Sequence, residues 1–210
     1  MFNYILYFHD FFSYVYSTIL FKKKANMDAN NINYNEEVLK GGLIVAGVSI
    51  LILMVTYIVN VEMMVEWWYG LISLAISIGL TIYIGVSFRN TIGGFMSYKN
   101  ALKFTFLVLT VSYIVGASFN ILLYNVIDPT LPELIKQLTV ENTISMMENW
   151  GAPQETIDAS IPEIEKSIDE NTSPMGIIKA TPWGLLFIFI VAAITSIFVK
   201  KNEPVSDRIN

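Results

Sequence analysis

Four long segments of the chain are apolar and contain no charged side chain. Residues 41–61, 67–88, 104–127 and 180–199 hold no Asp, Glu, Lys, Arg or His. Each segment has close to the roughly 20 residues that a helix needs to cross about 30 Å of hydrocarbon. The runs are continuous rather than alternating, and only helices or closed barrels satisfy their backbone groups in lipid. The pattern therefore predicts four transmembrane helices.

Between the third and fourth segments, residues 128–179 combine apolar and acidic positions at helical spacing. Gly151 and Pro153 divide this insert into two parts, so we expect two or three short amphipathic helices. Pro162 is expected in the first turn of the last helix, capped by Ser160. The apolar positions are Leu131, Leu134, Ile135 and Leu138 in the first part, and Ile157, Ile161, Ile164 and Ile168 in the second.

The apolar stripes of the insert need a surface to cover them. That surface is the other stripe, the bilayer surface or another protein. Many carboxylates accompany the stripes, and a carboxylate-rich face suits anionic lipid poorly. Mutual packing of the stripes is therefore the favoured interpretation.

The composition agrees with a membrane protein. Of the 210 residues, 54% are hydrophobic and only 15% are charged, and the mean hydropathy is +0.53. Soluble domains carry about 25% charged residues. Residues 128–176 hold ten carboxylates, opposed only by Lys136 and Lys166. We therefore predict an all-α fold, an integral membrane four-helix bundle with an acidic amphipathic-helical extramembrane insert between helices 3 and 4.

The basic residues lie at alternate ends of the predicted spans. Cytoplasmic loops carry an excess of Lys and Arg. Residues 27–127 are therefore expected to form a cytoplasmic lead and helices 1–3, and residues 180–210 helix 4 and a cytoplasmic tail. Residues 128–179 then form the insert on the outer side, which is the periplasm in a Gram-negative bacterium. The basic positions are Lys22, Lys23, Lys24 and Lys40 before the first span, Arg89, Lys99 and Lys103 after the second, and Lys200, Lys201 and Arg208 after the fourth.

Residues 1–26 form a leader whose role the pattern leaves open. Residues 2–21 are apolar and aromatic, but His9 and Asp10 interrupt them and no basic residue precedes them. A secretory signal has a basic start and a small-residue cleavage site. The leader is interpreted as an extra helix, an interfacial helix or an upstream extension. We expect Met27 to be the true initiator.

The predicted spans lack the residues on which most membrane chemistry depends. An ionisable residue within a span marks a functional site by default, yet the single histidine is His9 and no span holds an acidic or basic side chain. Cysteine is absent, which excludes disulfides and thiolate metal sites. The carboxylates of the insert lack the spacing of a calcium loop, and no basic patch suggests nucleic-acid binding. We expect no enzymatic activity, no catalytic residue, no metal, no cofactor and no nucleic-acid partner.

The spans do carry small and weakly polar residues at four-residue steps. Such residues let helix backbones approach closely in lipid, and an Asn in hydrocarbon seeks a hydrogen bond to another helix. We expect these stripes to pack the bundle. The alternatives are that one stripe docks a partner subunit or that Asn120 lines a small polar pocket. The candidates are Ser73, Ser77, Thr81 and Gly85 in the second span and Ser112, Gly116 and Asn120 in the third.

Four stretches carry a family resemblance. They are residues 94–103 (GFMSYKNALK), residues 124–129 (YNVIDP), residues 150–159 (WGAPQETIDA) and residues 172–174 (TSP). Together they resemble a family of small four-span membrane proteins that is widespread in Bacteroidota and known only as a domain of unknown function. The resemblance covers roughly residues 35–201. It implies a bacterial inner (cytoplasmic) membrane and the same topology, and it implies no activity.

These observations lead to two functional hypotheses. The first is a non-catalytic inner-membrane protein that serves as an accessory subunit of a larger assembly, in contact with the lipid bilayer and with other membrane or periplasmic proteins through its insert. The alternative is a small-molecule or ion permeation protein that uses the polar stripes of helices 2 and 3.

Overall fold

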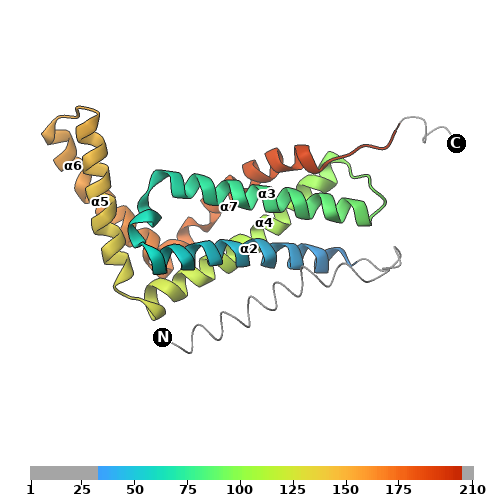
Figure 1. The fold of residues 1–210 in the computed structure, drawn as a ribbon, viewed down its shortest axis with the longest axis horizontal. Coiled ribbons are helices and arrows are strands. Elements are labelled where there is room, and N and C mark those ends of the chain that lie inside the picture. The colour runs from blue at the N-terminus through green and yellow to red at the C-terminus, as the bar shows by residue number, and fades with distance from the viewer. Residues whose placement is uncertain (1–32, 205–210) are drawn as a thin grey trace.

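The computed structural model describes residues 33–204, which are almost entirely helical (Figure 1). The predictions for residues 1–26 and for Met27 lie outside the described residues. In chain order the elements are α2 (Tyr34–Val59), a 3₁₀ turn η3 (Val61–Val65), α3 (Trp67–Thr91), α4 (Tyr98–Leu122), a π-helical turn η4 (Leu123–Ile127), α5 (Leu131–Asn149), α6 (Gln154–Thr172) and α7 (Pro174–Val199).

Four helices of the described chain are long and apolar enough to cross a membrane. They are α2, α3, α4 together with η4, and α7, which agrees with the four spans expected from the sequence. The four run alongside one another as a bundle (Figure 1). The protein is therefore a multi-pass membrane protein.

Three of these helices, α2, α4 and α7, begin earlier than the apolar runs. α4 begins after Ser97, whose hydroxyl accepts from the backbone N–H of Asn100 at 3.4 Å. α2 begins at Tyr34 because the Asn33 side chain accepts a hydrogen bond from the backbone N–H of Asn35, at 3.2 Å, which is the usual cap of a helix N-terminus. α7 begins at Pro174 because the Ser173 hydroxyl accepts from the N–H of Gly176, at 3.0 Å. The caps, rather than the first apolar residue, decide where each helix starts.

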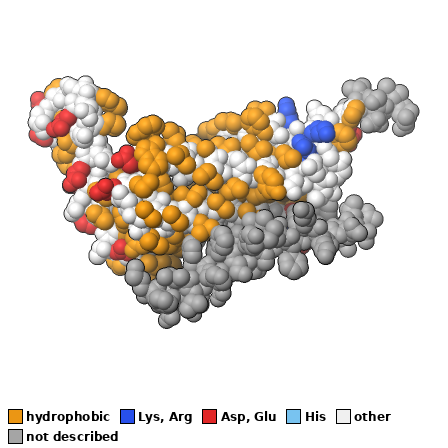
Figure 2. Space-filling view, viewed as in Figure 1, with side chains coloured by type: hydrophobic (Ala, Val, Ile, Leu, Met, Phe, Trp, Pro, Cys, Tyr) orange, Lys and Arg blue, Asp and Glu red, His pale blue; other side chains and the backbone are white. Residues whose placement is uncertain are grey.

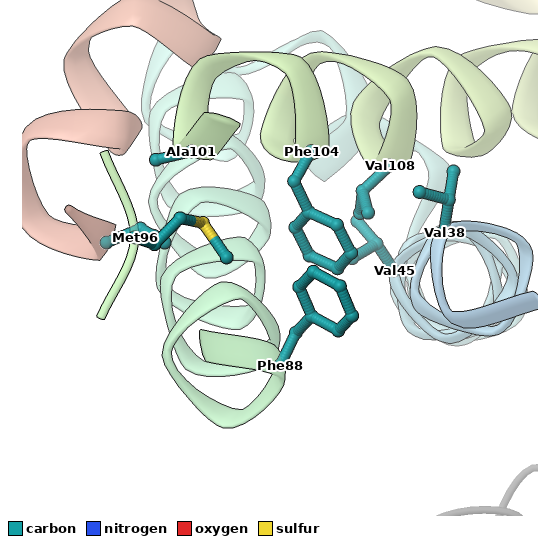
Figure 3. Close-up of a cluster of buried hydrophobic side chains, with 8 residues drawn as sticks. Val38, Val45, Phe88, Met96, Ala101, Phe104 and Val108 are labelled. Carbon is teal, nitrogen blue, oxygen red and sulfur yellow. The ribbon is translucent and has the colours of Figure 1, made fainter. Parts of the chain in front are cut away.

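α4 is the central helix of the bundle, with α2 on one side and α7 on the other. Its contact with α2 is very close at Gly42, where an added Cβ would lie 2.5 Å from Val111 Cβ and 2.9 Å from the carbonyl oxygen of Val108. Phe88 of α3 and Phe104 of α4 stack with their ring centroids 4.3 Å apart (Figure 3). These contacts make a compact core in the half of the bundle that holds the α3–α4 loop.

The last turn of α3 and the loop after it also contact the C-terminal end of α7. We call this end of the molecule the basic end of the bundle. Arg89, in the last turn of α3, donates from its guanidinium to the carbonyl oxygen of Val199 at 2.8 Å. The backbones of Met96 and Lys201 exchange two hydrogen bonds, at 2.8 and 2.9 Å. The carbonyls at a helix C-terminus lack intrahelical partners, so these contacts both satisfy the end of α7 and fix its position.

α5 and α6 form an antiparallel pair, which we call the hairpin, at the opposite end of the bundle (Figure 1). The two helices pack against each other, as expected from their apolar stripes, and Ile157 of α6 is buried. Lys136 bridges Glu133 at 2.8 Å and Asp169 at 3.0 Å. These two carboxylates raise the pKa of Lys136 to about 12.

The expectation for Pro162 is wrong. The structure has a single helix from Gln154 to Thr172 with Pro162 inside it, rather than a new helix that begins there. Ser160 does not cap a helix, because its hydroxyl donates to the carbonyl oxygen of Ile157 at 2.8 Å. An interior proline removes one backbone hydrogen bond and its ring crowds the carbonyl four residues earlier. Packing of α6 on α5 on both sides of Pro162 offsets this cost.

A polar pocket beneath the hairpin

The small-residue stripe of α3 faces other helices of the same chain. Ser77 Oγ lies 3.5 Å from Ser49 Oγ of α2. Thr81 is fully buried, and a Cβ added at Gly85 would lie 2.7 Å from Val199 of α7. Ser73 has a buried hydroxyl without a hydrogen-bond partner among the described residues. This stripe is therefore occupied by contacts within the bundle.

The stripe of α4 behaves differently. A Cβ added at Gly116 would meet no atom within 4 Å, so this glycine does not mark a close helix contact within the described residues. Ser112, one turn away, is half-buried. Gly116 and Asn120 instead line a pocket, which is the arrangement that the sequence offered as an alternative for Asn120.

The pocket has a volume of about 300 Å³ and lies where the bundle meets the hairpin. This volume is at the lower end of the range found for small-molecule sites, about 300–1,000 Å³. α2, α3 and α4 form its walls, and α5 contributes one side chain at its hairpin end. Its lining residues are Ser49, Ile50, Leu53, Met64, Tyr69, Gly116, Asn120, Tyr124 and Ile135.

Three hydrogen-bonding side chains in this lining have no partner among the described residues. They are the Tyr69 hydroxyl, the Asn120 amide and the Tyr124 hydroxyl. The other lining residues are mostly apolar, and none carries a formal charge at neutral pH. The three side chains are half-buried, and their polar atoms are not among the fully buried unpaired ones. The pocket therefore suits an uncharged group that can donate and accept hydrogen bonds.

The pocket does not continue toward the basic end. One turn below Ser49, Val45 is 1% exposed, and Val108 of the facing helix is 0% exposed. Deeper still, the hydroxyls of Thr105 and Ser196 lie 2.9 Å apart and are buried. Packed side chains therefore close the pocket within the bundle.

A hydrogen bond across the hairpin end joins α2 to the chain that leaves α4. The Tyr57 hydroxyl donates to Asp128 at 2.9 Å. Thr130 also donates to Asp128, from its hydroxyl at 2.6 Å and from its backbone N–H at 3.0 Å. These bonds hold the pKa of the Asp128 carboxyl below its usual value, and the bond from the Thr130 hydroxyl has the largest effect.

A larger cavity, of about 570 Å³, lies at the basic end. Tyr34, Asn100 and Lys103 contribute its polar groups, and the Lys103 ammonium lies 5.4 Å from the centre of the Tyr34 ring. None of the helix-packing candidates named from the sequence lines it. Among the described residues, no group of three or more His, Cys, Asp or Glu is placed to hold a metal ion.

Sequence reasoning identified Asn120 and Gly116 but missed most of the pocket. Ser49 and Tyr69 lie on other helices, and Ile135 belongs to the hairpin. The available signal was weak, because a tyrosine near the end of a span is ordinarily an interfacial anchor. Only the folded arrangement brings these side chains to one place.

Comparison with known proteins gives the family of the chain. The family model described as "Protein of unknown function (DUF4199)" matches residues 40–201, which takes in the bundle from early α2 together with the hairpin. No curated protein and no solved structure matches the chain. The resemblance to a domain of unknown function is thus confirmed, and the chain belongs to the DUF4199 family of proteins of unknown function.

Proposed function

We propose that the chain is a non-catalytic protein of a bacterial inner membrane, of the Bacteroidota kind that it resembles, and that it serves as an accessory subunit of a larger membrane assembly. Its hairpin is the docking element, and the partner presents a basic surface. The observation that carries the proposal is that α6 has two faces with different side chains. The apolar stripe of α6 packs on α5, while its carboxylates stay exposed.

The exposed face of α6 is strongly acidic. Six carboxylates on this helix are exposed and only one lysine, Lys166, accompanies them. One of the six, Asp169, pairs with Lys136 of α5. Figure 2 shows the acidic side chains gathered on the hairpin and the basic ones at the other end of the bundle. The six are Glu155, Asp158, Glu163, Glu165, Asp169 and Glu170.

An exposed face of one charge sign adds little to the stability of its own helix. Its usual effect is on association, because complementary charge steers partners together and rejects partners of like charge. α5 and α6 pack on each other, so a partner meets a preformed surface and little conformational entropy is lost on binding. The same charge division supports a topology with the basic end in the cytoplasm and the hairpin in the periplasm.

The proposal is tested by gentle extraction of the native membrane and mass spectrometry, followed by reconstitution of the purified pair. We expect a complex of fixed stoichiometry that weakens with rising salt and is lost when Glu163→Gln and Glu165→Gln are combined. Glu62→Gln with Glu66→Gln is the matched control, because these acids lie at the same end of the bundle but outside the hairpin. Recovery of only the lone chain or a homo-oligomer contradicts the proposal, as does equal binding by the two double variants.

A permeation protein is the second candidate, favoured by the unpartnered polar groups of the pocket. The packed residues that close the pocket would have to move for a solute to pass. Purified protein in liposomes tests this by the uptake of small uncharged solutes such as glycerol and urea. Uptake above that of empty liposomes, abolished by Asn120→Leu, would favour permeation over the accessory role.

A further inference from the structure

Near the hairpin turn, α6 lies on the side of α5 away from the spanning helices (Figure 1), whereas its C-terminal end meets α7. α5 is the helix of the hairpin that faces the bundle there. It contacts η3, and its Ile135 reaches into the polar pocket. In Figure 1 the hairpin begins beside the bundle and runs across its end, so that the α5–α6 turn projects beyond the outline of the four spanning helices, past α3. The second half of α5 therefore has no helix of the described chain beneath it.

The side of α5 that faces the bundle continues into this overhanging half. Met146 follows Ile135 by eleven residues, which is close to three helical turns of about 3.6 residues each. Trp150 follows one turn later. Side chains at such spacings share one side of a helix, so Met146 and Trp150 point the same way as Ile135, toward the membrane side of the hairpin.

These two side chains are large, apolar and open to solvent in the isolated chain. Trp150 is 77% exposed and Met146 is 42% exposed. The acidic residue of this part of α5, Glu148, points to the other side of the helix. It is two positions from Met146 and two from Trp150, which is about 200° around the helix axis. Figure 2 agrees, with hydrophobic side chains on the bundle side of the hairpin tip and acidic ones on the opposite side.

We propose that the hairpin tip rests on the bilayer, with Trp150 and Met146 in the headgroup region of the leaflet on the hairpin side. Tryptophan favours this level, because its ring is apolar and its N–H is a hydrogen-bond donor. Zwitterionic lipid is the fitting surface, since the carboxylates of the hairpin disfavour an anionic one. This contact is independent of any partner on α6, which lies on the opposite side of the hairpin.

The chain has no cysteine, so single cysteines can be labelled without altering it otherwise. Met146→Cys carrying a nitroxide is placed in phosphatidylcholine nanodiscs, and Glu163→Cys on the outer face of α6 is the matched control. We expect the label at 146 to collide more with oxygen, which enters lipid, than with a water-soluble nickel chelate, and the control to show the reverse. An anionic phosphatidylglycerol disc should shift the label at 146 toward water.

A second measurement uses the native side chain. The difference in fluorescence between the unaltered protein and Trp150→Tyr belongs to Trp150, and lipid brominated near the headgroup should quench it several-fold more than acrylamide does. Water-like accessibility at 146 together with quenching of Trp150 mainly by acrylamide would overturn the proposal. A label shielded from both collision partners would also overturn it, because that result indicates contact with protein.

Discussion

Gly42 provides the sharpest test of how the bundle is packed. In Gly42→Ala, the new Cβ would lie 2.5 Å from Val111 Cβ and Cγ1 and 2.9 Å from the Val108 carbonyl oxygen. The Cβ of Val111 and the oxygen of Val108 belong to or are fixed by the α4 backbone, so no side-chain rotation removes the clash. α2 and α4 must move apart. Overpacking of this kind costs about 1–3 kcal/mol.

The same substitution also raises helix propensity, which by itself favours alanine by about 1 kcal/mol. Gly116→Ala is the matched control, because it makes the same chemical change in an apolar span and its Cβ meets no atom within 4 Å. The difference between the two variants therefore isolates the packing cost. With the clash against backbone-fixed atoms, we expect Gly42→Ala to be less stable than Gly116→Ala by about 2–3 kcal/mol.

The assay is reversible unfolding in mixed micelles as the fraction of sodium dodecyl sulfate is raised, followed by circular dichroism. Gly42→Ala should unfold at a lower fraction than the unaltered chain, and Gly116→Ala at an equal or higher one. A larger substitution, Gly42→Val, should fall further in the same direction. If Gly42→Ala and Gly116→Ala unfold together, the close approach of α2 and α4 is not what holds the bundle.

Three other predictions concern the ends of the bundle and the pocket. Arg89→Ala should lower the stability of the fold by about 1.5 kcal/mol, because a hydrogen bond from a charged group to Val199 is lost. Amide hydrogen exchange should become faster in the last turn of α7, and unchanged exchange would contradict this. The pKa of Asp128 is lowered in the folded protein, so its stabilising effect is complete above about pH 4, the unfolded value, and is lost as pH falls through the folded pKa. Thermal melts should show that the unaltered chain loses more stability below pH ~4 than Asp128→Asn does, and Tyr57→Phe should reduce this difference. Asn120→Leu should leave the chain as stable or more stable in the dodecyl sulfate assay, since an unpartnered polar group leaves an apolar wall; a marked loss would mean that Asn120 has a structural hydrogen bond.

The spanning helices were accessible to sequence reasoning because a single physical constraint, satisfaction of the backbone in lipid, acts along each of them independently. The starts of α2, α4 and α7 were not, since the side chains of Asn33, Ser97 and Ser173 cap these helices before the apolar runs begin. The positions of close helix packing were predicted only in part, because Gly85 of α3 does pack closely on Val199 of α7 but Gly116 of α4 does not pack on another helix of the described chain. The sequence drew attention to Gly116, whereas the very close approach of α2 to α4 is at Gly42, and a glycine's neighbours belong to another helix whose rotation no local pattern specifies.

The hairpin shows the same limit. Its two apolar stripes predicted two packed helices, but the proline rule favoured a helix start at Pro162 where the structure has a helix interior. Tertiary packing outweighed the local preference there. The pocket is harder still to predict from the sequence, because it depends on how α5 lies across the end of the bundle and brings Ile135 into the same lining as Asn120.

The joint between the hairpin and the last spanning helix consists of one residue. α6 ends at Thr172 and α7 begins at Pro174, so Ser173 closes one helix and caps the next. Such a short connection leaves almost no slack. The direction of α6 and the direction of α7 are therefore set together at Ser173, while Arg89 fixes the opposite end of α7 at the basic end.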